Sequence, residues 1–284
     1  MYSFHDIKLL QFGLKENPLF FRAMKLYFPI KQIRRQEQNF EVSSEASGRH
    51  ARTASRIALT CLTKSDACRL FRLLGIEAEA RRYMFRNNED NCFGIGIAIY
   101  KDRSLLRDTR YKLYNYYHKS KTGTDQAAHL KTIAARLHLN VSRIASDIQR
   151  FRKIRMSAVD LYETGERSLK IYYGPFPTDA LFAVYDDLLN KKTIKTYKEF
   201  RRKGWLPPKV MLVVRYQKND TWSVRTDFPF DTSDVKKHLR HFDKTGAARK
   251  LYQALVPVAN IIRISYICID LDKRPRTQFY FLVL

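Results

Sequence analysis

Residues 154–173 read IRMSAVDLYETGERSLKIYY, two runs of alternating side chains that flank a turn at 163–166. Runs of this length that are rich in Val, Ile and Tyr and are joined by a short Gly-containing turn predict a β-hairpin. The apolar residues of the second run share one face, because successive residues of a strand point to opposite faces. Lys170 and Tyr172 share the other face, so one side of this hairpin is polar.

The pattern of a hairpin followed by a stretch of helical periodicity recurs along the chain. Alternating runs separated by turn residues predict four hairpins, at 39–62, 154–173, 210–228 and 258–284. Apolar residues spaced three or four apart predict helices at 9–28, 64–86, 125–151, 178–202 and 232–255. Ser65 or Asp66 stands where the second of these helices needs a cap, and a further strand is expected at 92–100.

Hairpins that alternate with helices, without a pattern of parallel crossovers, indicate an α+β protein in which helices cover one face of an antiparallel sheet. About eight to ten such strands form either an open sheet or a barrel, whose closure removes the exposed edges. We expect a single domain over residues 1–284, with a basic, largely helical insertion or elaboration at 101–150.

Composition bounds the class of protein. The chain has 284 residues, of which 45% are hydrophobic, and a formal net charge of +25; this hydrophobic share argues against intrinsic disorder. Its four cysteines and seven histidines lack the spacing of a disulfide framework or a zinc site, so no metal held by protein side chains is expected. Apolar runs are shorter than a membrane span and the first residues lack a signal-peptide pattern, so we expect a cytoplasmic protein without a membrane partner.

Alternation also sorts the charged residues of the strands. If the apolar face of every strand meets helices, one cation from each of five strands lies on a common second face: Arg56, Lys170, Arg215, Arg225 and Arg263. Glu45, Tyr172 and Tyr280 fall on the same face. One interpretation is a solvated sheet face, since Lys and Arg are mostly exposed. The other is a closed barrel, in which cations this close need a polyanionic guest such as a diphosphate, whose oxygens suit Arg and Lys.

Two hairpins carry a resemblance to a known family. Residues 43–62, SSEASGRHARTASRIALTCL, and 156–173, MSAVDLYETGERSLKIYY, resemble hairpins of the peptide prenyltransferases of cyanobactin biosynthesis in their Ser-Glu-Ala-Ser, Ala-Ser-Arg and Ser-Leu-Lys segments. The resemblance implies the ABBA barrel, an antiparallel β-barrel of about ten strands with a polar lumen, surrounded by α-helices. It also implies an enzyme that moves a dimethylallyl or geranyl group from its diphosphate to a side chain of a ribosomally made peptide (RiPP), expected to be cyclic.

The same resemblance implies roles for single residues. Glu45 corresponds to the acid that removes the proton from the acceptor, and Arg56 and Lys170 correspond to ligands of the diphosphate. The implied mechanism adds three further ligands: Arg215, Arg225 and Arg263. Mg²⁺ would bridge the phosphates without ligands from the protein.

The donor side of the implied mechanism involves four more residues. Tyr172 and Tyr280 would shield the allylic cation from water through their ring faces. Ser265 and Ile267, at the floor of the donor pocket, would set the length of isoprenoid that fits.

A strongly basic chain with a sequence pI near 10.0 is also typical of nucleic-acid-binding proteins, which neutralise phosphates. Basic clusters at 31–35, 191–203 and 236–250 could form such a surface, or they could be ordinary solvated helix faces. Because no recognition motif accompanies them, nucleic acid is not expected as the main partner, and a basic nucleic-acid-binding protein without catalytic activity is the alternative function. A barrel that serves as a scaffold without chemistry is a third.

Overall fold

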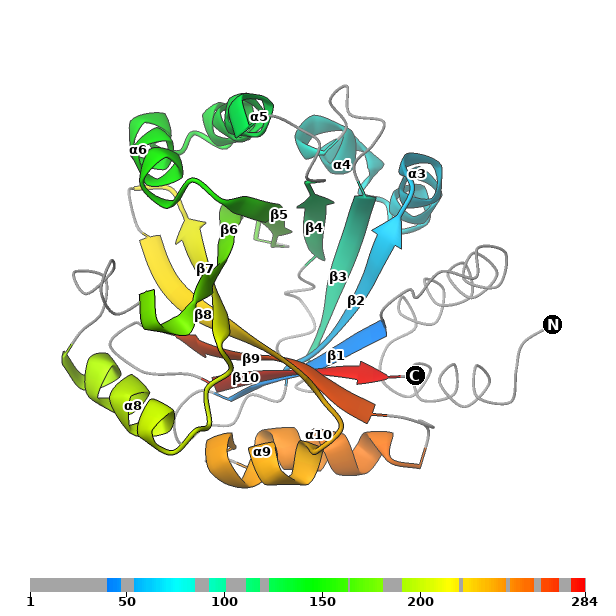
Figure 1. Cartoon of the computed structure of the whole chain (residues 1–284). Helices are drawn as coiled ribbons and strands as arrows, with labels where there is room; N and C mark the ends of the chain where they lie inside the picture. The colour runs from blue at the N-terminus through cyan, green and yellow to red at the C-terminus, as the bar shows by residue number, and fades with distance from the viewer. Residues whose placement is uncertain are drawn as a thin grey trace.

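The structure is a computed structural model. It describes residues 40–46, 54–84, 92–100, 111–117, 123–162, 164–180, 191–219, 222–243, 246–257, 262–270 and 277–283. Ten strands among these residues form a closed antiparallel barrel (Figure 1). The strands are β1 (Phe40–Ala46), β2 (Ala54–Leu62), β3 (Cys92–Tyr100), β4 (Tyr111–Tyr116), β5 (Ile154–Leu161), β6 (Arg167–Pro177), β7 (Lys209–Tyr216), β8 (Trp222–Thr232), β9 (Ile262–Asp270) and β10 (Thr277–Val283).

Every strand pairs with the strand next to it in the sequence, and β10 pairs with β1 to close the barrel. The four predicted hairpins are confirmed as β1–β2, β5–β6, β7–β8 and β9–β10. Closure leaves no unpaired edge among these ten strands, so the backbone polar groups of the ladder are satisfied all the way round. The predicted antiparallel barrel of about ten strands is therefore confirmed.

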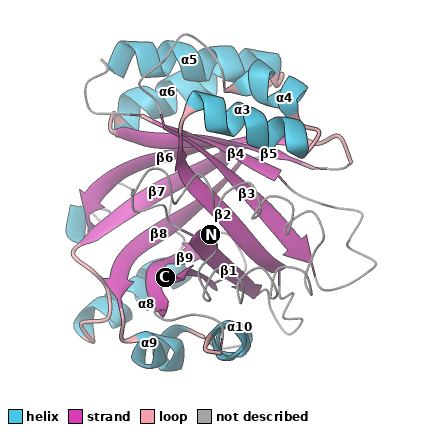
Figure 2. Ribbon diagram, turned by 90° about the vertical axis from the view of Figure 1, so that its right-hand side faces the viewer, coloured by secondary structure: helices cyan, strands magenta, loops and turns pink. Residues whose placement is uncertain are grey.

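The helices lie outside the barrel in two layers (Figure 2). One layer holds α3 (Lys64–Leu73), α4 (Glu77–Tyr83), α5 (Gly123–Arg136) and α6 (Val141–Phe151), and the other holds α8 (Lys191–Arg202), α9 (Val235–Phe242) and α10 (Ala247–Leu255). α3 packs on β2 and β3, α5 on β5, α9 on β9, and α10 on β1 and β10. No helix in the described part of the chain is long and apolar enough to cross a membrane.

The helix predicted at 64–86 is in fact two helices. α3 begins after Thr63, whose hydroxyl oxygen accepts a hydrogen bond from the backbone N–H of Asp66 at 3.3 Å, so the cap is Thr63 and not Ser65 or Asp66. α3 ends just before Gly75, whose φ is 70°. Glycine adopts this left-handed conformation readily, whereas a residue with a Cβ is strained there. The left-handed glycine turns the chain, and α4 begins two residues later.

The segment at 101–150 differs from the prediction in one respect. It contributes β4, which lies in the barrel between β3 and β5, so it is not an insertion outside the barrel. Its remaining described residues form α5 and α6, and the helix predicted at 125–151 is divided between them. The helix predicted at 9–28 lies outside the described residues.

Apolar side chains of the strands pack in two places. The main core lies between the barrel and the helices and includes Ile171, Val214 and Phe279, each no more than 1% exposed. A smaller group of Tyr114, Ala158, Tyr172 and Val213 lies on the inner face of the barrel. The outer face is therefore apolar under helices, as the alternation predicted, and the inner face is mixed.

Ile267 belongs to the main core, where it is fully buried and pairs with Phe228 and Phe279. The interpretation that placed it at the floor of a donor pocket inside the barrel is therefore wrong. The register between β9 and β10 shifts at Tyr280, so Ile264 and Ile267 face the helices although they are an odd number of residues apart. An irregularity of this kind inverts the alternation on one side of it.

Replacing Ile267 with alanine leaves a cavity under the helices. We expect Ile267→Ala to lower the free energy of unfolding by about 2–5 kcal/mol, through lost burial and incomplete relaxation around the site. Guanidinium unfolding followed by circular dichroism measures the change. A loss below about 1 kcal/mol, within the range of ordinary surface substitutions, would contradict this placement.

Candidate functional site in the barrel interior

The inner face of the barrel carries polar side chains on β4 to β7. Paired residues of neighbouring strands lie on the same face of the sheet, and the register pairs Lys112 with Asp160 and Lys170 with Arg215. Asp160 is also paired with Ser168 of β6. Residues from four consecutive strands therefore meet inside the barrel.

Asp160 is the centre of this group. Its carboxylate lies 3.2 Å from Nζ of Lys170 and 3.8 Å from Nζ of Lys112. It also accepts a hydrogen bond from Oγ of Ser168 at 3.1 Å. Asp160 is 0% exposed, Lys112 1% and Lys170 6%. Each of these charges would be costly to bury on its own, and the opposite charges offset one another's desolvation.

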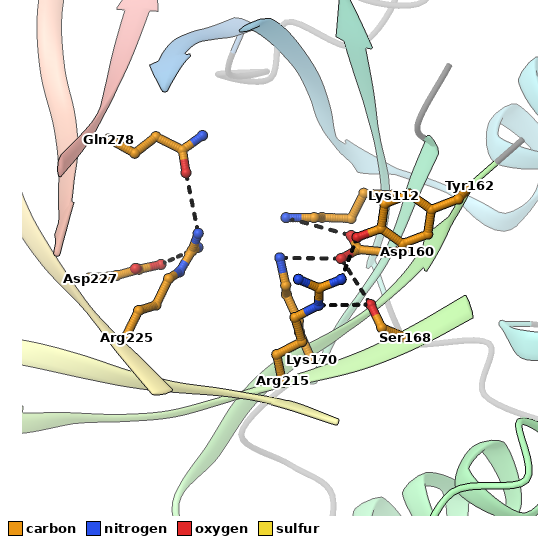
Figure 3. Close-up of polar contacts among 9 residues, drawn as sticks. All are labelled: Lys112, Asp160, Tyr162, Ser168, Lys170, Arg215, Arg225, Asp227 and Gln278. Carbon is orange, nitrogen blue, oxygen red and sulfur yellow. Dashed lines mark hydrogen bonds and ion pairs between the residues drawn. The ribbon is translucent and has the colours of Figure 1, made fainter. Parts of the chain in front are cut away.

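Arg215 extends the group toward solvent, because it is only partly buried. Its Nε donates to Oγ of Ser168 at 3.2 Å, and its Nη2 donates to the hydroxyl of Tyr162 at 2.6 Å. The guanidinium carbon lies 5.8 Å from the centre of the Tyr162 ring. The Asp160 cluster, as we call it below, comprises Lys112, Asp160, Tyr162, Ser168, Lys170 and Arg215 (Figure 3).

A second charged group, Arg225 with Asp227 and Gln278, faces the Asp160 cluster across the barrel interior (Figure 3). Arg225 donates from Nη2 to Asp227 at 2.8 Å and from Nη1 to Oε1 of Gln278 at 3.3 Å. Burial opposes the charge of Arg225, but the nearby carboxylate of Asp227 and other acidic neighbours outweigh it and raise the pKa of the guanidinium well above its usual range. The Arg225 group, as we call these three residues, therefore keeps its cation at any physiological pH.

The two groups hold more positive than negative charge. Their cations are Lys112, Lys170, Arg215 and Arg225, and their carboxylates are Asp160 and Asp227. Nε of Arg225 is buried and has no hydrogen-bond partner among the described residues. A surplus of buried cations is costly, and an anion between the two groups would relieve both their repulsion and this unmet donor. Ammonium and guanidinium groups on opposite walls suit the oxygens of a diphosphate.

Tyrosine rings line the interior beside the charged groups. Tyr172 is 2% exposed and Tyr114 is 6% exposed, and Tyr116 stacks on Tyr114 with ring centres 6.0 Å apart. Burial raises the pKa of the Tyr172 phenol well above its usual value, and Tyr114 adds to this effect. The Tyr172 ring therefore stays neutral and presents a π-face to the interior.

These rings already contact cations of both charged groups. Nζ of Lys112 lies 5.4 Å from the centre of the Tyr114 ring, and the guanidinium carbon of Arg225 lies 6.0 Å from that of Tyr172. A cation over an aromatic face is attracted by the ring quadrupole. The interior therefore combines a place for an anion with surfaces that stabilise a cation.

The structure brings five of the predicted site residues into this interior: Lys170, Arg215, Arg225, Tyr172 and Tyr280. Tyr280 is 6% exposed and lies close enough to Tyr172 and Arg225 to act on both electrostatically. The prediction that cations and tyrosines from several strands share one enclosed face is therefore correct for these residues.

Three other predicted residues are described only through their backbone. Glu45 is paired with Gln278 of the Arg225 group. Arg56 of β2 is paired with Ser43 of β1. Ser265 lies at the register shift of β9. Their side chains lie outside the described residues, so their predicted roles stay predictions.

Arg263 does not belong to this site. It is exposed and lies at the start of β9, whereas Arg225 pairs with Asp270 at the other end of that strand. Seven residues of extended chain separate the two positions by about 23 Å. The prediction that Arg263 joins the other cations is therefore wrong, because Arg263 lies at the opposite end of β9 from the position beside Arg225.

Sequence reasoning assigned no role to several residues of the site. Lys112 and Tyr114 belong to YKLYNY, which alternates as a strand does but sits in a stretch that was interpreted as helical. Asp160 shares a strand face with Ala158 in the first run of the 154–173 hairpin, where its polarity was a usable signal. Asp227 is two residues from Arg225 in β8, so strand alternation places both on the same face. These carboxylates are what allow the cations to be buried.

Magnesium finds no protein site among the described residues. They contain no group of three or more His, Cys, Asp or Glu side chains that could hold a metal ion. Asp160 and Asp227, which could serve as oxygen ligands, are each bound to cations of the protein instead. The residues that are present therefore suit direct contact of Lys and Arg with an anion.

No protein-family model and no curated protein sequence matches this chain. Solved structures do match its fold. The 5-dimethylallyltryptophan synthase of Streptomyces coelicolor aligns over 97% of this chain and 95% of its own, at 12% identity and a TM-score of 0.59. AnaPT of Neosartorya fischeri aligns over 99% of this chain and 91% of its own, at 11% identity and a TM-score of 0.61.

A third match is the 6-dimethylallyltryptophan synthase of Micromonospora olivasterospora in complex with DMASPP and Trp. It covers 86% of this chain and 81% of its own, at 13% identity and a TM-score of 0.58. Identities this low show that the chain shares the barrel fold of these proteins. They say nothing about single residues, so the site above rests on its own geometry.

An anion site of this kind should bind inorganic pyrophosphate. We expect Lys112→Met to weaken pyrophosphate binding by about tenfold or more, since a hydrogen bond to a charged group contributes about 1.5–3 kcal/mol. Isothermal titration calorimetry measures the affinity. Lys131→Met, at an exposed position of α5, is the matched control and should leave the affinity unchanged. Equal affinities in the two variants would contradict the site, and Lys112→Arg, which keeps the charge, guards against a folding defect.

Proposed function

We propose that this protein is a prenyltransferase that takes a dimethylallyl or geranyl group from its diphosphate. One observation carries the proposal: buried cations on opposite walls of a closed barrel lie directly beside neutral tyrosine rings. Ionisation of an allylic diphosphate produces an anion and a carbocation side by side, and this interior has a complement for each.

The comparisons support this proposal at the level of fold. Proteins of the same barrel fold carry the names 5- and 6-dimethylallyltryptophan synthase, and one of these structures contains DMASPP and Trp. Another, PriB, was solved as a binary complex with product diphosphate at 11% identity to this chain. Because one fold hosts many functions, the reaction is inferred from the charged and aromatic side chains inside the barrel of this chain.

Donor binding is assigned to the two charged groups. Lys112, Lys170 and Arg215 approach the diphosphate from one wall and Arg225 from the other, with its buried Nε available as a further donor. As the bond between the allylic carbon and the diphosphate oxygen breaks, its electron pair leaves with the diphosphate. Cations fixed in place before the reaction stabilise that developing charge without a cost of reorganisation.

The tyrosine rings are assigned to the carbocation. Tyr172 and Tyr114 hold apolar, buried faces next to the diphosphate ligands, where an isoprenoid chain would lie. Their π-faces attract the allylic cation, and their bulk excludes water that would otherwise capture it. Because burial raises the pKa of Tyr172, its phenol stays protonated and does not compete as a phenolate.

Glu45 is assigned to the acceptor. The acceptor atom forms the new bond to the allylic carbon and then loses a proton, for which a carboxylate is a suitable base. The backbone position of Glu45 is opposite Gln278, which accepts a hydrogen bond from the proposed diphosphate ligand Arg225 at 3.3 Å. That register position supports the role that the resemblance implied.

The acceptor that we propose is a side chain of a ribosomally made peptide, cyclic or linear. This choice rests on the resemblance of the 43–62 and 156–173 hairpins to the peptide prenyltransferases, whereas the fold neighbours are named for tryptophan. Free tryptophan and peptides can be compared as acceptors in the same assay.

The proposal is tested by incubating the protein with dimethylallyl or geranyl diphosphate, with and without Mg²⁺, and with tryptophan or a panel of cyclic and linear peptides. We expect a mass gain of one or two isoprene units on at least one peptide, read by mass spectrometry. A gain on tryptophan alone would overturn the peptide assignment. No gain on any acceptor, from protein that binds pyrophosphate, would overturn prenyl transfer.

Removing the proposed base should separate catalysis from donor binding. We expect Glu45→Gln to lower kcat by about 10²–10⁴-fold, the usual contribution of a general base, and to leave pyrophosphate affinity within a factor of about two. Steady-state kinetics and calorimetry measure the two quantities. Glu166→Gln, at an exposed turn position, is the matched control and should change neither. Full activity in Glu45→Gln would assign the base to another residue.

A further inference from the structure

We propose that the helix layer formed by α8, α9 and α10 binds a double-stranded nucleic acid through its phosphate backbone. This would be a second function, on the outside of the protein and separate from the chemistry inside the barrel. The layer lies on the side of the barrel opposite α3 to α6 (Figure 2).

The exposed side chains of this layer are mostly cations. Eight of them form no ion pair with the described residues: Lys195, Lys198, Arg202, Lys236, Lys237, Arg240, Arg249 and Lys250. The exposed acids described on the three helices and their caps are Glu199, which pairs with Lys203, and Asp234, which caps α9. The described acids therefore do not balance the positive charge of the described cations on this surface.

The opposite helix layer has a different charge pattern. There Glu77 binds both Arg72 and Arg81, at 3.2 and 2.6 Å. Arg143 lies 3.6 Å from Asp147 along α6. These cations of that layer are interleaved with carboxylates, although Lys64, Arg69 and Lys131 are exposed there without an ion pair to the described residues. Among the described residues, carboxylates are therefore more numerous on α3 to α6, and the surface of α8 to α10 is the more positive of the two.

Aromatic contacts make α8 and α9 one continuous surface. Phe200 of α8 packs edge-on against Phe242 of α9 with ring centres 5.1 Å apart. Trp205, which follows α8, stacks on His241 of α9 at 4.0 Å. The two sequence clusters at 191–203 and 236–250 are thus brought side by side by the fold. Their cations act on the same partner.

The kind of partner follows from what this surface lacks. A closed barrel offers no strand edge for an extended peptide among its ten strands. Among the described residues the exposed large hydrophobic side chains are Leu73 and Val256, so these helices present no apolar groove for a partner helix. Charge is what the surface offers, and nucleic-acid backbones are recognised through charge.

The surface also favours a duplex over a single strand. Proteins that bind single strands stack bases on exposed aromatic rings. The ring of Trp205 already contacts His241, and Nζ of Lys203 lies 4.6 Å from its centre. A duplex keeps its bases inside and presents phosphates outside, about one charge per 1.7 Å of its axis. α8, with 12 residues, is about 18 Å long and would lie along about ten phosphates.

Binding would also remove a cost that the free protein carries. Cations gathered on one surface repel one another and destabilise the compact state at low ionic strength. Phosphates between them would lift that repulsion and release condensed counterions. Binding of a nucleic acid to this surface should therefore weaken strongly as the salt concentration rises.

The test uses the full chain and a fluorescein-labelled DNA duplex of about 24 base pairs, titrated by fluorescence anisotropy from about 50 to about 200 mM salt. The first variant replaces Lys195, Lys198 and Arg202 with glutamine, and the second replaces Lys236, Arg240 and Lys250. We expect each to weaken binding by tenfold or more and to reduce the slope of log K against log salt by about two to three, near 0.9 per lost phosphate contact.

The control variant replaces three exposed cations of the opposite layer with glutamine: Lys64, Arg69 and Lys131. It removes the same charge and should change the affinity by less than about twofold. An equal loss in the control would overturn the site, since it would show that net charge alone binds DNA. No binding at the lower salt would overturn the function. Equal binding of poly-glutamate, or tighter binding of the single strand, would overturn the assignment to a duplex.

This outcome is independent of prenyl transfer. Pyrophosphate binding by Lys112 and Arg225 reports on the barrel interior, and duplex binding reports on α8 to α10. All three triple variants should keep wild-type pyrophosphate affinity, which also shows that they are folded. A protein that transfers prenyl groups but binds no duplex would refute this inference and leave the proposed function intact.

Discussion

The ion pairs of Asp160 with Lys112 and Lys170 are the interaction on which the rest of the interior depends. Closing ten strands into a barrel turns one face of every strand inward, and charged side chains on that face leave bulk water. Two ammonium groups close together in such a place would not be stable alone. The carboxylate of Asp160 between them offsets the free-energy cost of burying both ammonium groups. Ser168 donates a hydrogen bond to one oxygen of that carboxylate.

Among the described residues, the Asp160 cluster and the Arg225 group together hold more cations than carboxylates. Asp160 forms ion pairs with two lysines and Asp227 with Arg225, whereas Arg215 donates hydrogen bonds to the hydroxyl groups of Ser168 and Tyr162. A site that is fully neutral would gain little from an anion, and a site without carboxylates would not fold with its cations buried. The partial compensation seen here is the condition for binding a polyanion reversibly. The neighbouring tyrosines can stabilise a cation in the same interior, because the faces of their rings attract positive charge.

Much of this could be predicted from the sequence because strand alternation is a local property. Alternation in the 154–173 hairpin correctly predicted that Lys170 and Tyr172 lie inside the barrel. Alternation in the next hairpin correctly predicted the same for Arg215 and Arg225. What failed has a physical reason in each case. The register shift in β9 is set by its pairing with β10, so it moved Ile267 to the helix side without any signal in its own strand. β4 is a short strand in a basic stretch, and its neighbours β3 and β5 give it a place that local periodicity did not.

The same barrel divides the charge of this chain into two populations with different physics. Inside, each cation is near an opposite charge or a hydroxyl, and the low dielectric makes every such contact strong. Outside, on α8 to α10, the exposed cations stand in water, where salt screens each of them, so their effect on a partner comes from their sum over the surface rather than from single pairs. An interior of the first kind selects a small ligand by geometry. A surface of the second kind selects a large, regularly charged one, and because closure separates the two faces of every strand, one chain can carry both.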